Sequence, residues 1–209
     1  MLVVIYNEAQ GHGLGFGDIS GSGRGDFVLN KGWLEAPADP FTGTWTLHPD
    51  FELGWDASVP ILVEDVNGDG LNDIIVGRGH NYGLDWYEQG RDAAGNRTWT
   101  RHPIDPFYSQ YHDLQWADID GDGKPELVTG KRHRAHCGND PGEWDDMNIV
   151  YFKWNGESFT KCIIDFARIE QGPSGVGIFF QLADLRHTGR LDLIAPGKDG
   201  LYVYYNEGM

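Results

Sequence analysis

Two sets of residues in this 209-residue chain have types and spacings that suggest chemistry. One set forms short acidic turns, and the other consists of histidines that stand among lysines and arginines. Closely spaced carboxylates are ligands for hard cations such as calcium, whereas neutral imidazoles bind zinc or accept protons. The two sets therefore predict two different kinds of site.

Four nine-residue segments, which begin at Asp18, Asp65, Asp118 and Asp184, align without gaps. In the second and third, side-chain oxygens occupy positions one, three, five and nine, and glycines at positions four and six allow a tight curl. With the backbone carbonyl of position seven, each segment offers the oxygen donors that suit calcium. The predicted calcium ligands are Asp65, Asn67, Asp69, Leu71 and Asp73 in one turn, and Asp118, Asp120, Asp122, Lys124 and Glu126 in the other.

The turns 18–26 and 184–192 have lost predicted ligands. The first has serines at positions three and five, and the fourth has Arg186 and Thr188 there. We therefore expect these two turns to bind metal poorly. A second interpretation applies to all four segments, because turns rich in Asp, Asn and Gly also form without a metal ion.

Short apolar segments before and after each acidic turn predict a strand on either side of it. Two further predicted strands follow in most repeats, and four strands in about 40 to 50 residues are typical of a β-propeller blade. The sequence thus predicts one all-β propeller domain over 1–209, with about four blades of four antiparallel strands. Cys162 aligns with His48 and His102, so we expect it to be a structural residue of an outer strand.

In such a blade, the residues before the first strand and those after the second share one rim, opposite the acidic turns. His12 and His112 both stand six residues ahead of the leading aspartate of their turn. A cation recurs after the second strand of each repeat, and two long loops add more polar residues. The predicted rim contains the cations Lys31, Arg78, Lys131, Arg132, Arg134 and Lys198, together with His80, Tyr82, Tyr111, His133, His136 and Asp140.

This rim holds six of the 16 lysines and arginines in a chain whose net charge is −16. A cluster of cations predicts that it binds a small anion, such as the carboxylate of a sugar. The histidines allow three interpretations: a zinc or other divalent site, a general base, or hydrogen bonds alone. The predicted zinc ligands are His80, His112, His133 and His136.

The acidic turns resemble the FG-GAP or VCBS type of calcium-stabilised propeller blade, the group that includes the integrin α-chain head. Such propellers usually close with about seven blades. The resemblance therefore implies an arc of a larger propeller, or a chain that a partner closes, with a closed four-bladed ring as the alternative. Residues 2–8 resemble 201–207, which predicts that they form the third strand of an earlier blade.

The loop 129–142, with 109–113 and 175–177, is similar to the propeller portion of FG-GAP proteins related to aldos-2-ulose dehydratase. Those proteins are metal-using sugar lyases, whose cupin-like region has no counterpart in this sequence. The resemblance implies loss of water from a keto-sugar after proton abstraction next to the carbonyl. We expect His112 or His136 to be the base, Tyr111 the acid, Arg78 and Lys131 the anion stabilisers, and Lys31, His80, Tyr82, Arg132, Arg134 and Asp140 the substrate-binding residues.

A carbohydrate lyase or dehydratase is therefore the first functional hypothesis. The alternative is a binding module, a lectin or a protein-adhesion propeller, and the third possibility is a structural unit that works only with further blades or domains or with a second copy. The acidic balance argues against nucleic acid. The apolar segment Leu2–Tyr6 is too short for a membrane span or a signal peptide. Calcium turns favour an extracellular location, and the role of Cys137 in the rim loop stays open.

Overall fold

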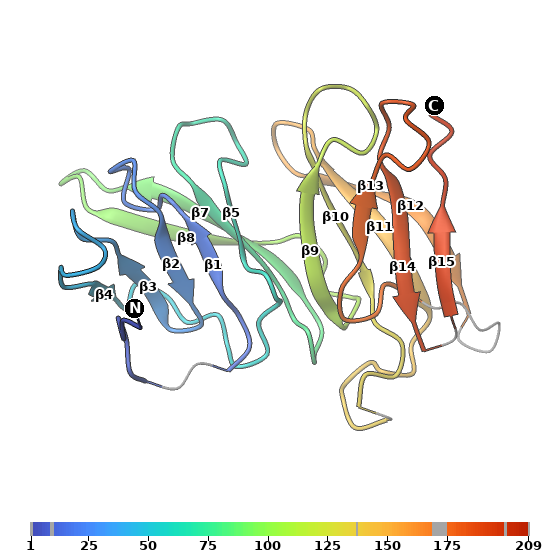
Figure 1. The fold of residues 1–209 in the computed structure, drawn as a ribbon, viewed down its shortest axis with the longest axis horizontal. Coiled ribbons are helices and arrows are strands. Elements are labelled where there is room, and N and C mark those ends of the chain that lie inside the picture. Colours follow the sequence, from blue (N-terminus) through green and yellow to red (C-terminus); the bar gives the residue numbers. More distant parts are fainter. Residues whose placement is uncertain (1, 9–10, 137, 169–174, 199, 209) are drawn as a thin grey trace.

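The computed structural model of the chain describes residues 2–8, 11–136, 138–168, 175–198 and 200–208. Regular structure in these residues consists of strands, which form four separate antiparallel sheets (Figure 1). The described residues include no helix, and hence none long and apolar enough to cross a membrane. Cys137 lies outside the described residues.

Each sheet is built from strands that follow one another in the chain. The first sheet contains β1 (Gly15–Gly17), β2 (Asp26–Leu29), β3 (Gly32–Glu35) and β4 (Thr46–His48). The second contains β5 (Leu62–Glu64), β6 (Asp73–Gly77), β7 (Leu84–Arg91) and β8 (Arg97–Pro103). The third contains β9 (Tyr111–Ala117), β10 (Glu126–Lys131), β11 (Met147–Trp154) and β12 (Phe159–Ala167), and the fourth contains β13 (Gln181–Ala183), β14 (Asp192–Gly197) and β15 (Gly200–Tyr204).

The sheets confirm the predicted all-β fold with four propeller blades. An acidic turn joins the first two strands of every sheet, as expected. Cys162 pairs with Tyr151 on the outer strand, just as His102 pairs with Trp86, which confirms its alignment with that histidine. The expectation of a strand over residues 2–8 is wrong, because the structure gives this segment no strand.

Apolar side chains between consecutive sheets hold the blades together. Ile74 and Ile75 are neighbours on β6 and both are fully buried, but they belong to different cores. Ile74 packs toward the first sheet and Ile75 toward the third, because successive side chains on a strand point to opposite faces. The second and third sheets also approach closely at Gly77, where a β-carbon would lie 2.4 Å from the carbonyl oxygen of Tyr111.

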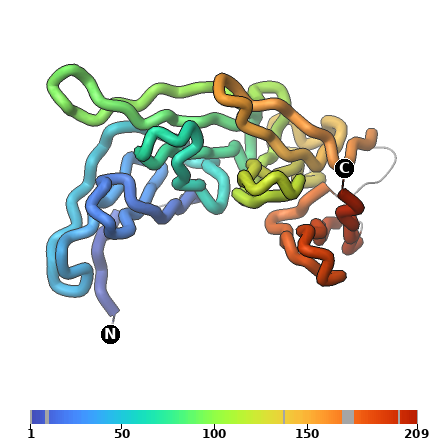
Figure 2. The backbone as a smooth tube through the Cα atoms, turned by 90° about the horizontal axis from the view of Figure 1, so that it is seen from above, coloured from blue at the N-terminus to red at the C-terminus, as the bar shows by residue number. Residues whose placement is uncertain are grey.

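The four sheets follow one another around an arc, with the hairpin of β7 and β8 on its outer side (Figure 2). Three apolar cores join the consecutive pairs of sheets, and no core among the described residues joins the first sheet to the fourth. Apolar side chains are exposed on both end sheets, including Phe16 on β1 (64 %) and Leu201 on β15 (71 %). The arc therefore presents an apolar face at either end.

The leading aspartate of each acidic turn shapes the turn by accepting backbone hydrogen bonds. Asp65 accepts from the N–H groups of Gly68, Asp69 and Gly70 at 2.9 to 3.0 Å. Gly68 and Gly70 have φ values of 77° and 87°, which other residues adopt only with strain. Asp18, Asp118 and Asp184 accept equivalent bonds. The same curl thus forms in the two turns that lack a full set of calcium ligands.

The closing acid of each turn is fully buried and connects the turn to the rest of its sheet. Asp26, Asp73 and Asp192 each accept a 2.8 Å hydrogen bond from a backbone N–H at the end of the third strand or just beyond it. Burial raises the pKa of Asp73 to about 6, although its backbone hydrogen bonds act in the opposite direction. Glu126 is the exception: its Oε2 accepts from the N–H of Ile119, but its buried Oε1 has no hydrogen bond among the described residues.

Leu114 offers a test of the packing between the second and third sheets. It is 1 % exposed in the core that they share. We expect Leu114→Ala to lower the free energy of unfolding by roughly 2–5 kcal/mol, because it leaves a cavity in that core. Urea denaturation measures this change. Leu201→Ala is the control on the exposed end face and should change stability by less than about 0.5 kcal/mol; a large loss there would mean that this face is covered in solution.

Candidate functional site

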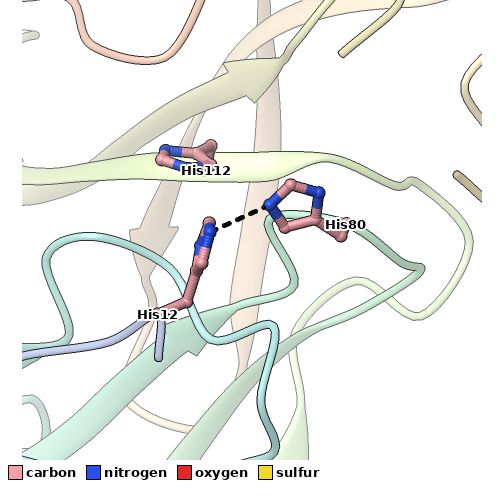
Figure 3. Close-up of side chains that lie close together, drawn as sticks. All are labelled: His12, His80 and His112. Carbon is pink, nitrogen blue, oxygen red and sulfur yellow. Dashed lines mark hydrogen bonds between the residues drawn. The ribbon is translucent and has the colours of Figure 1, made fainter. Parts of the chain in front are cut away.

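Three histidines from distant parts of the chain converge on one point (Figure 3). His12 precedes β1, His80 lies in the loop between β6 and β7, and His112 projects from β9. One nitrogen of each ring lies within 4.8 Å of one nitrogen of both others. His80 and His112 are buried, and Nε2 of His80 lies 3.1 Å from Nε2 of His12. We call His12, His80 and His112 the histidine cluster.

The repeat geometry explains why two of these residues meet. His12 and His112 occupy the same position of their repeats, and Val59 and Ile178 occupy it in the other two. The backbone N–H of Val59 donates to the carbonyl oxygen of His112 at 2.8 Å. The carbonyl oxygen of Ile178 lies 3.1 Å from Nδ1 of the same histidine. Equivalent positions of three repeats are thus in contact around His112.

Fixed acceptors orient two rings of the cluster. Nδ1 of His80 lies 2.8 Å from Oδ2 of Asp140, and Nδ1 of His112 faces the carbonyl of Ile178. Both acceptors favour a proton on Nδ1, which leaves the lone pair on Nε2, and Nη2 of Arg132 also lies 3.2 Å from Nδ1 of His80. Metal-binding histidines in proteins are typically held in this way.

Burial and positive charge favour the neutral form of His12 and His112. Burial, together with the charges of Arg132 and His12, lowers the pKa of His112 to about 4. Burial also lowers the pKa of His12, with smaller contributions from His80 and Arg132, although the backbone of Ala57 opposes the shift. Neutral imidazoles at pH 7 are the form that can bind a metal ion.

Asp140 and His136 extend the cluster on one side. The carboxylate of Asp140 contacts Nδ1 of His136 at 3.0 Å as well as Nδ1 of His80. The ring of His136 stacks on that of His80, with 4.5 Å between centroids. Burial alone would raise the pKa of Asp140, but the hydrogen bonds from the two histidines lower it overall. The same carboxylate therefore orients a buried ring and an exposed one.

Arg132 connects the cluster to a cavity of about 410 Å³. Its Nη2 donates to the carbonyl oxygen of Gly79 at 2.8 Å and lies 4.0 Å from Asp140. Its buried Nε has no hydrogen-bond partner among the described residues. A cavity of this size accommodates a small ligand. It is lined by Arg132, His133, Ala135, Gly177, Ile178, Phe179, Pro196, Gly197 and Lys198.

The two predicted tyrosines lie in environments that do not favour proton transfer. Tyr111 is fully buried, and its hydroxyl donates to Asp105 at 2.9 Å. Burial and Asp105 raise the pKa of Tyr111 well above its usual value. The prediction of Tyr111 as the acid is therefore corrected: it and His112 are neighbours on one strand, and their side chains point to opposite faces. The hydroxyl of Tyr82 donates to Asp145, which raises its pKa.

The structure does not gather all the predicted rim residues into one site. The Arg78 guanidinium lies 3.3 Å from Asp56, and the buried Lys131 ammonium donates to the carbonyl oxygen of Glu143 at 3.4 Å. Lys31 is exposed in the turn after β2. Arg134 lies over the ring of Trp144, and Lys198 donates to the carbonyl oxygen of Arg134. His133 lines the cavity. Among the described residues, it belongs to none of the groups that could hold a metal ion.

One member of the cluster and one of its neighbours were not among the predicted ligands or substrate-binding residues. His12 joins His80 and His112 as the third ring, and its position, equivalent to that of His112, is the sequence signal that points to it. The ring of Trp55 stacks on His80 at 5.7 Å and is 67 % exposed. The sequence gives no comparable signal for Trp55, because its contact with His80 depends on loop conformations.

The two complete acidic turns differ in what surrounds their carboxylates. In turn 65–73, the amide of Asn67 donates to Glu88 at 3.1 Å, so another carboxylate stands beside the predicted ligands. In turn 118–126, the ammonium of Lys153 donates to Asp120 and Asp122. The donor set of the first turn therefore fits a hard cation, whereas the second already contains a positive charge.

Comparison with known proteins supports the repeat assignment. The sequence model of the FG-GAP-like repeat family matches residues 65–129. This segment includes both complete acidic turns and runs from the second sheet into the third. No curated protein matches the chain.

Lys131→Met tests how much stability the protein loses by burying the charged ammonium of Lys131. Burial lowers the pKa of Lys131 to about 8, although Asp145 and Glu143 oppose the shift. Below pH 8 the lysine is charged in both the folded and unfolded states, so burying the charge lowers stability; as pH rises toward 10.5, the folded state loses its proton first and this penalty fades. We expect the variant to be about 1–3 kcal/mol more stable at pH 7, with a smaller gain at about pH 10.

Urea denaturation at the two pH values measures this gain. Lys31→Met is the control, because it removes an exposed lysine. Its effect should stay within about 0.5 kcal/mol at both pH values. If Lys131→Met destabilises the protein at pH 7, the ammonium contributes more through Asp145 and Glu143 than its burial costs.

The histidine cluster should bind one zinc ion, which calorimetric titration measures. We expect His12→Ala and His112→Ala to abolish binding, and Asp140→Asn to weaken it by about 10–100-fold because His80 loses its orienting carboxylate. His102→Ala, on an outer strand, is the matched control. His136→Ala should retain binding. The reverse pattern, with loss in His136→Ala and none in His12→Ala, would place the ion at His80, His136 and Asp140 instead.

Proposed function

We propose that this FG-GAP-like β-propeller holds a divalent metal ion at His12, His80 and His112 and acts on a small anionic carbohydrate, as a lyase or sugar dehydratase. One observation carries the proposal: a nitrogen of each of three imidazoles lies within 4.8 Å of one nitrogen of both others, and fixed acceptors orient two of the rings. Three protein ligands with an open position are typical of a catalytic zinc site. When bound, the ion would polarise a substrate carbonyl.

His136 is the base in this proposal. Its Nδ1 faces Asp140, so its Nε2 can accept a proton from the carbon next to the carbonyl. The stacking of His136 on His80 brings this base close to the histidine cluster. The bond from that carbon to hydrogen breaks, the electron pair forms the new double bond, and the hydroxyl at the next carbon leaves. Protonated His136 can return its proton to this hydroxyl, which departs as water.

Arg132 is the residue that we propose for recognition of the substrate anion. Its side chain is buried between the histidine cluster and the cavity, and its charge acts on both His12 and His112. The unpaired Nε–H offers a hydrogen bond to a carboxylate, and guanidinium groups bind carboxylates well. The adjoining cavity is large enough for a sugar ring. The earlier similarity to aldos-2-ulose dehydratase-related proteins is consistent with this substrate class and stays a prediction.

A non-catalytic module is the second candidate, as a lectin or an adhesion propeller. The observation that favours it is that neither predicted tyrosine has a free hydroxyl to act as the acid, because Tyr82 and Tyr111 both donate to carboxylates. In this alternative, the metal centre and Arg132 hold a carbohydrate or protein carboxylate without turnover. Calcium bound by Asp65, Asn67, Asp69 and Asp73 would stabilise the second blade in both candidates.

A lyase assay with zinc-loaded protein tests the first candidate. Keto-sugars and uronate oligosaccharides serve as substrates, and the ultraviolet absorbance of the new conjugated double bond reports turnover. We expect His136→Ala to lower the rate by about 10²–10⁴-fold while it still binds zinc, since it removes only the base. His102→Ala should react like the wild type.

The same variants separate the two candidates. A flat absorbance trace for the wild type across the panel would contradict the lyase proposal. Glycan-array binding that persists in His136→Ala, without turnover by any form, would favour the binding module. Loss of both zinc binding and glycan binding in His112→Ala would then show that the ion holds the ligand.

A further inference from the structure

The four acidic turns can be compared at one position of the third strand. Strand pairing places Leu34, Tyr87, Phe152 and Tyr204 opposite the residue that follows the closing acid. The next residue along therefore occupies an equivalent place in every repeat. It is Glu35, Glu88, Lys153 and Tyr205 in the first to fourth repeats, respectively. A positive charge occurs at this place in the third repeat alone.

Lys153 lies among the carboxylates of turn 118–126. Its Nζ donates to Oδ2 of Asp120 and, at 2.6 Å, to Oδ2 of Asp122. Oε1 of Glu126 is 3.8 Å from the same nitrogen. Asp120 and Glu126 have side chains that are 3 % and 1 % exposed, respectively. The hydrogen bonds that Lys153 donates to Asp120 and Asp122 raise its pKa above the usual value.

We propose that the ammonium of Lys153 takes the place of calcium in turn 118–126. The turn has the oxygen ligands that predict a calcium ion, but three of its carboxylates already face a cation supplied by the chain. A calcium ion would have to displace the ammonium and then lie within a few ångströms of a like charge. It also needs about six to eight oxygen ligands, and the bonds to Lys153 occupy two of those available.

In the third repeat, the closing acid Glu126 is connected to the third strand in a different way from the closing aspartates of the other repeats. The closing aspartates of the other three repeats accept a backbone hydrogen bond from the end of the third strand. Glu126 has one more methylene, and its Oε1 lies near Lys153 without a hydrogen bond among the described residues. A side-chain ion pair thus connects this turn to β11, where the other repeats use a backbone hydrogen bond.

The fourth repeat uses the same kind of internal cation independently. Arg186 stands at position three of turn 184–192, where the complete turns have an oxygen ligand. Its Nη2 lies 3.1 Å from Oδ1 of the closing acid Asp192 and donates to the carbonyl oxygen of Asn206 at 2.9 Å. Its Nη1 is 2.7 Å from Glu207. In two of the four turns, therefore, a cation of the chain itself contacts carboxylates of the turn.

Calcium titration calorimetry of four forms tests the inference: wild type, Asp122→Asn, Lys153→Met, and Lys153→Met with Asp122→Asn. We expect Asp122→Asn to leave calcium binding of the wild type unchanged, because Lys153 holds this turn. Lys153→Met should gain one equivalent of bound calcium, and Asp122→Asn in that background should remove it. Loss of one equivalent in Asp122→Asn alone, or no gain in Lys153→Met, would overturn the proposal.

Thermal unfolding gives a second readout and keeps the test separate from the calcium role of turn 65–73. Without calcium, Lys153→Met should melt below the wild type, since its carboxylates repel one another, and added calcium should remove this difference in melting temperature. Asp69→Asn reports on turn 65–73, so its failure to alter calcium binding would contradict the earlier proposal alone. Should Lys153→Met not fold, Lys153→Gln takes its place, with the same gain expected and the same absence of gain overturning the inference.

Discussion

The buried closing acid of each turn is the interaction on which the rest of the arc depends. A carboxylate that is fully excluded from water must be paired, and in three repeats the partner is a backbone N–H at the end of the third strand or just beyond it. This bond ties the first hairpin to the third strand and fixes the direction in which the inner strand runs. Because the inner strand is only three to seven residues long, its opposite end is fixed as well.

The histidine cluster is a consequence of that constraint. His12 and His112 begin their repeats at the same distance from the leading aspartate, and Val59 and Ile178 do so in the other two. Inner strands that start at equivalent places bring these residues together at the inner side of the arc, where backbone groups of Val59 and Ile178 contact His112. The third histidine of the cluster, His80, comes from a loop, and Asp140 from a second loop orients it.

The repeats predict the sheets because every blade uses the same turn, whereas the site depends on contacts between repeats. The alignment of Cys162 with His102 needs only strand spacing, and the register confirms it. The opposite orientations of Tyr111 and His112 also follow from strand periodicity, so that error was avoidable from the sequence. The contact of Lys153 with Asp120 was not predictable in the same way, because the length of the loop before β11 decides which residue of that strand faces the turn.

Counting cations overestimated the positive charge available to a ligand. What matters is whether a carboxylate or carbonyl of the protein already lies within reach of each cation. Arg78 and Lys131 have such partners, and so do Lys153 and Arg186 on the side of the turns. Arg132 also has a carbonyl partner, because its Nη2 donates to Gly79, but its buried Nε stays unpaired among the described residues, and Asp140, its carboxylate at 4.0 Å, is also bonded to His80 and His136. An incoming anion would therefore gain most beside Arg132, next to the three imidazoles that could hold the metal ion.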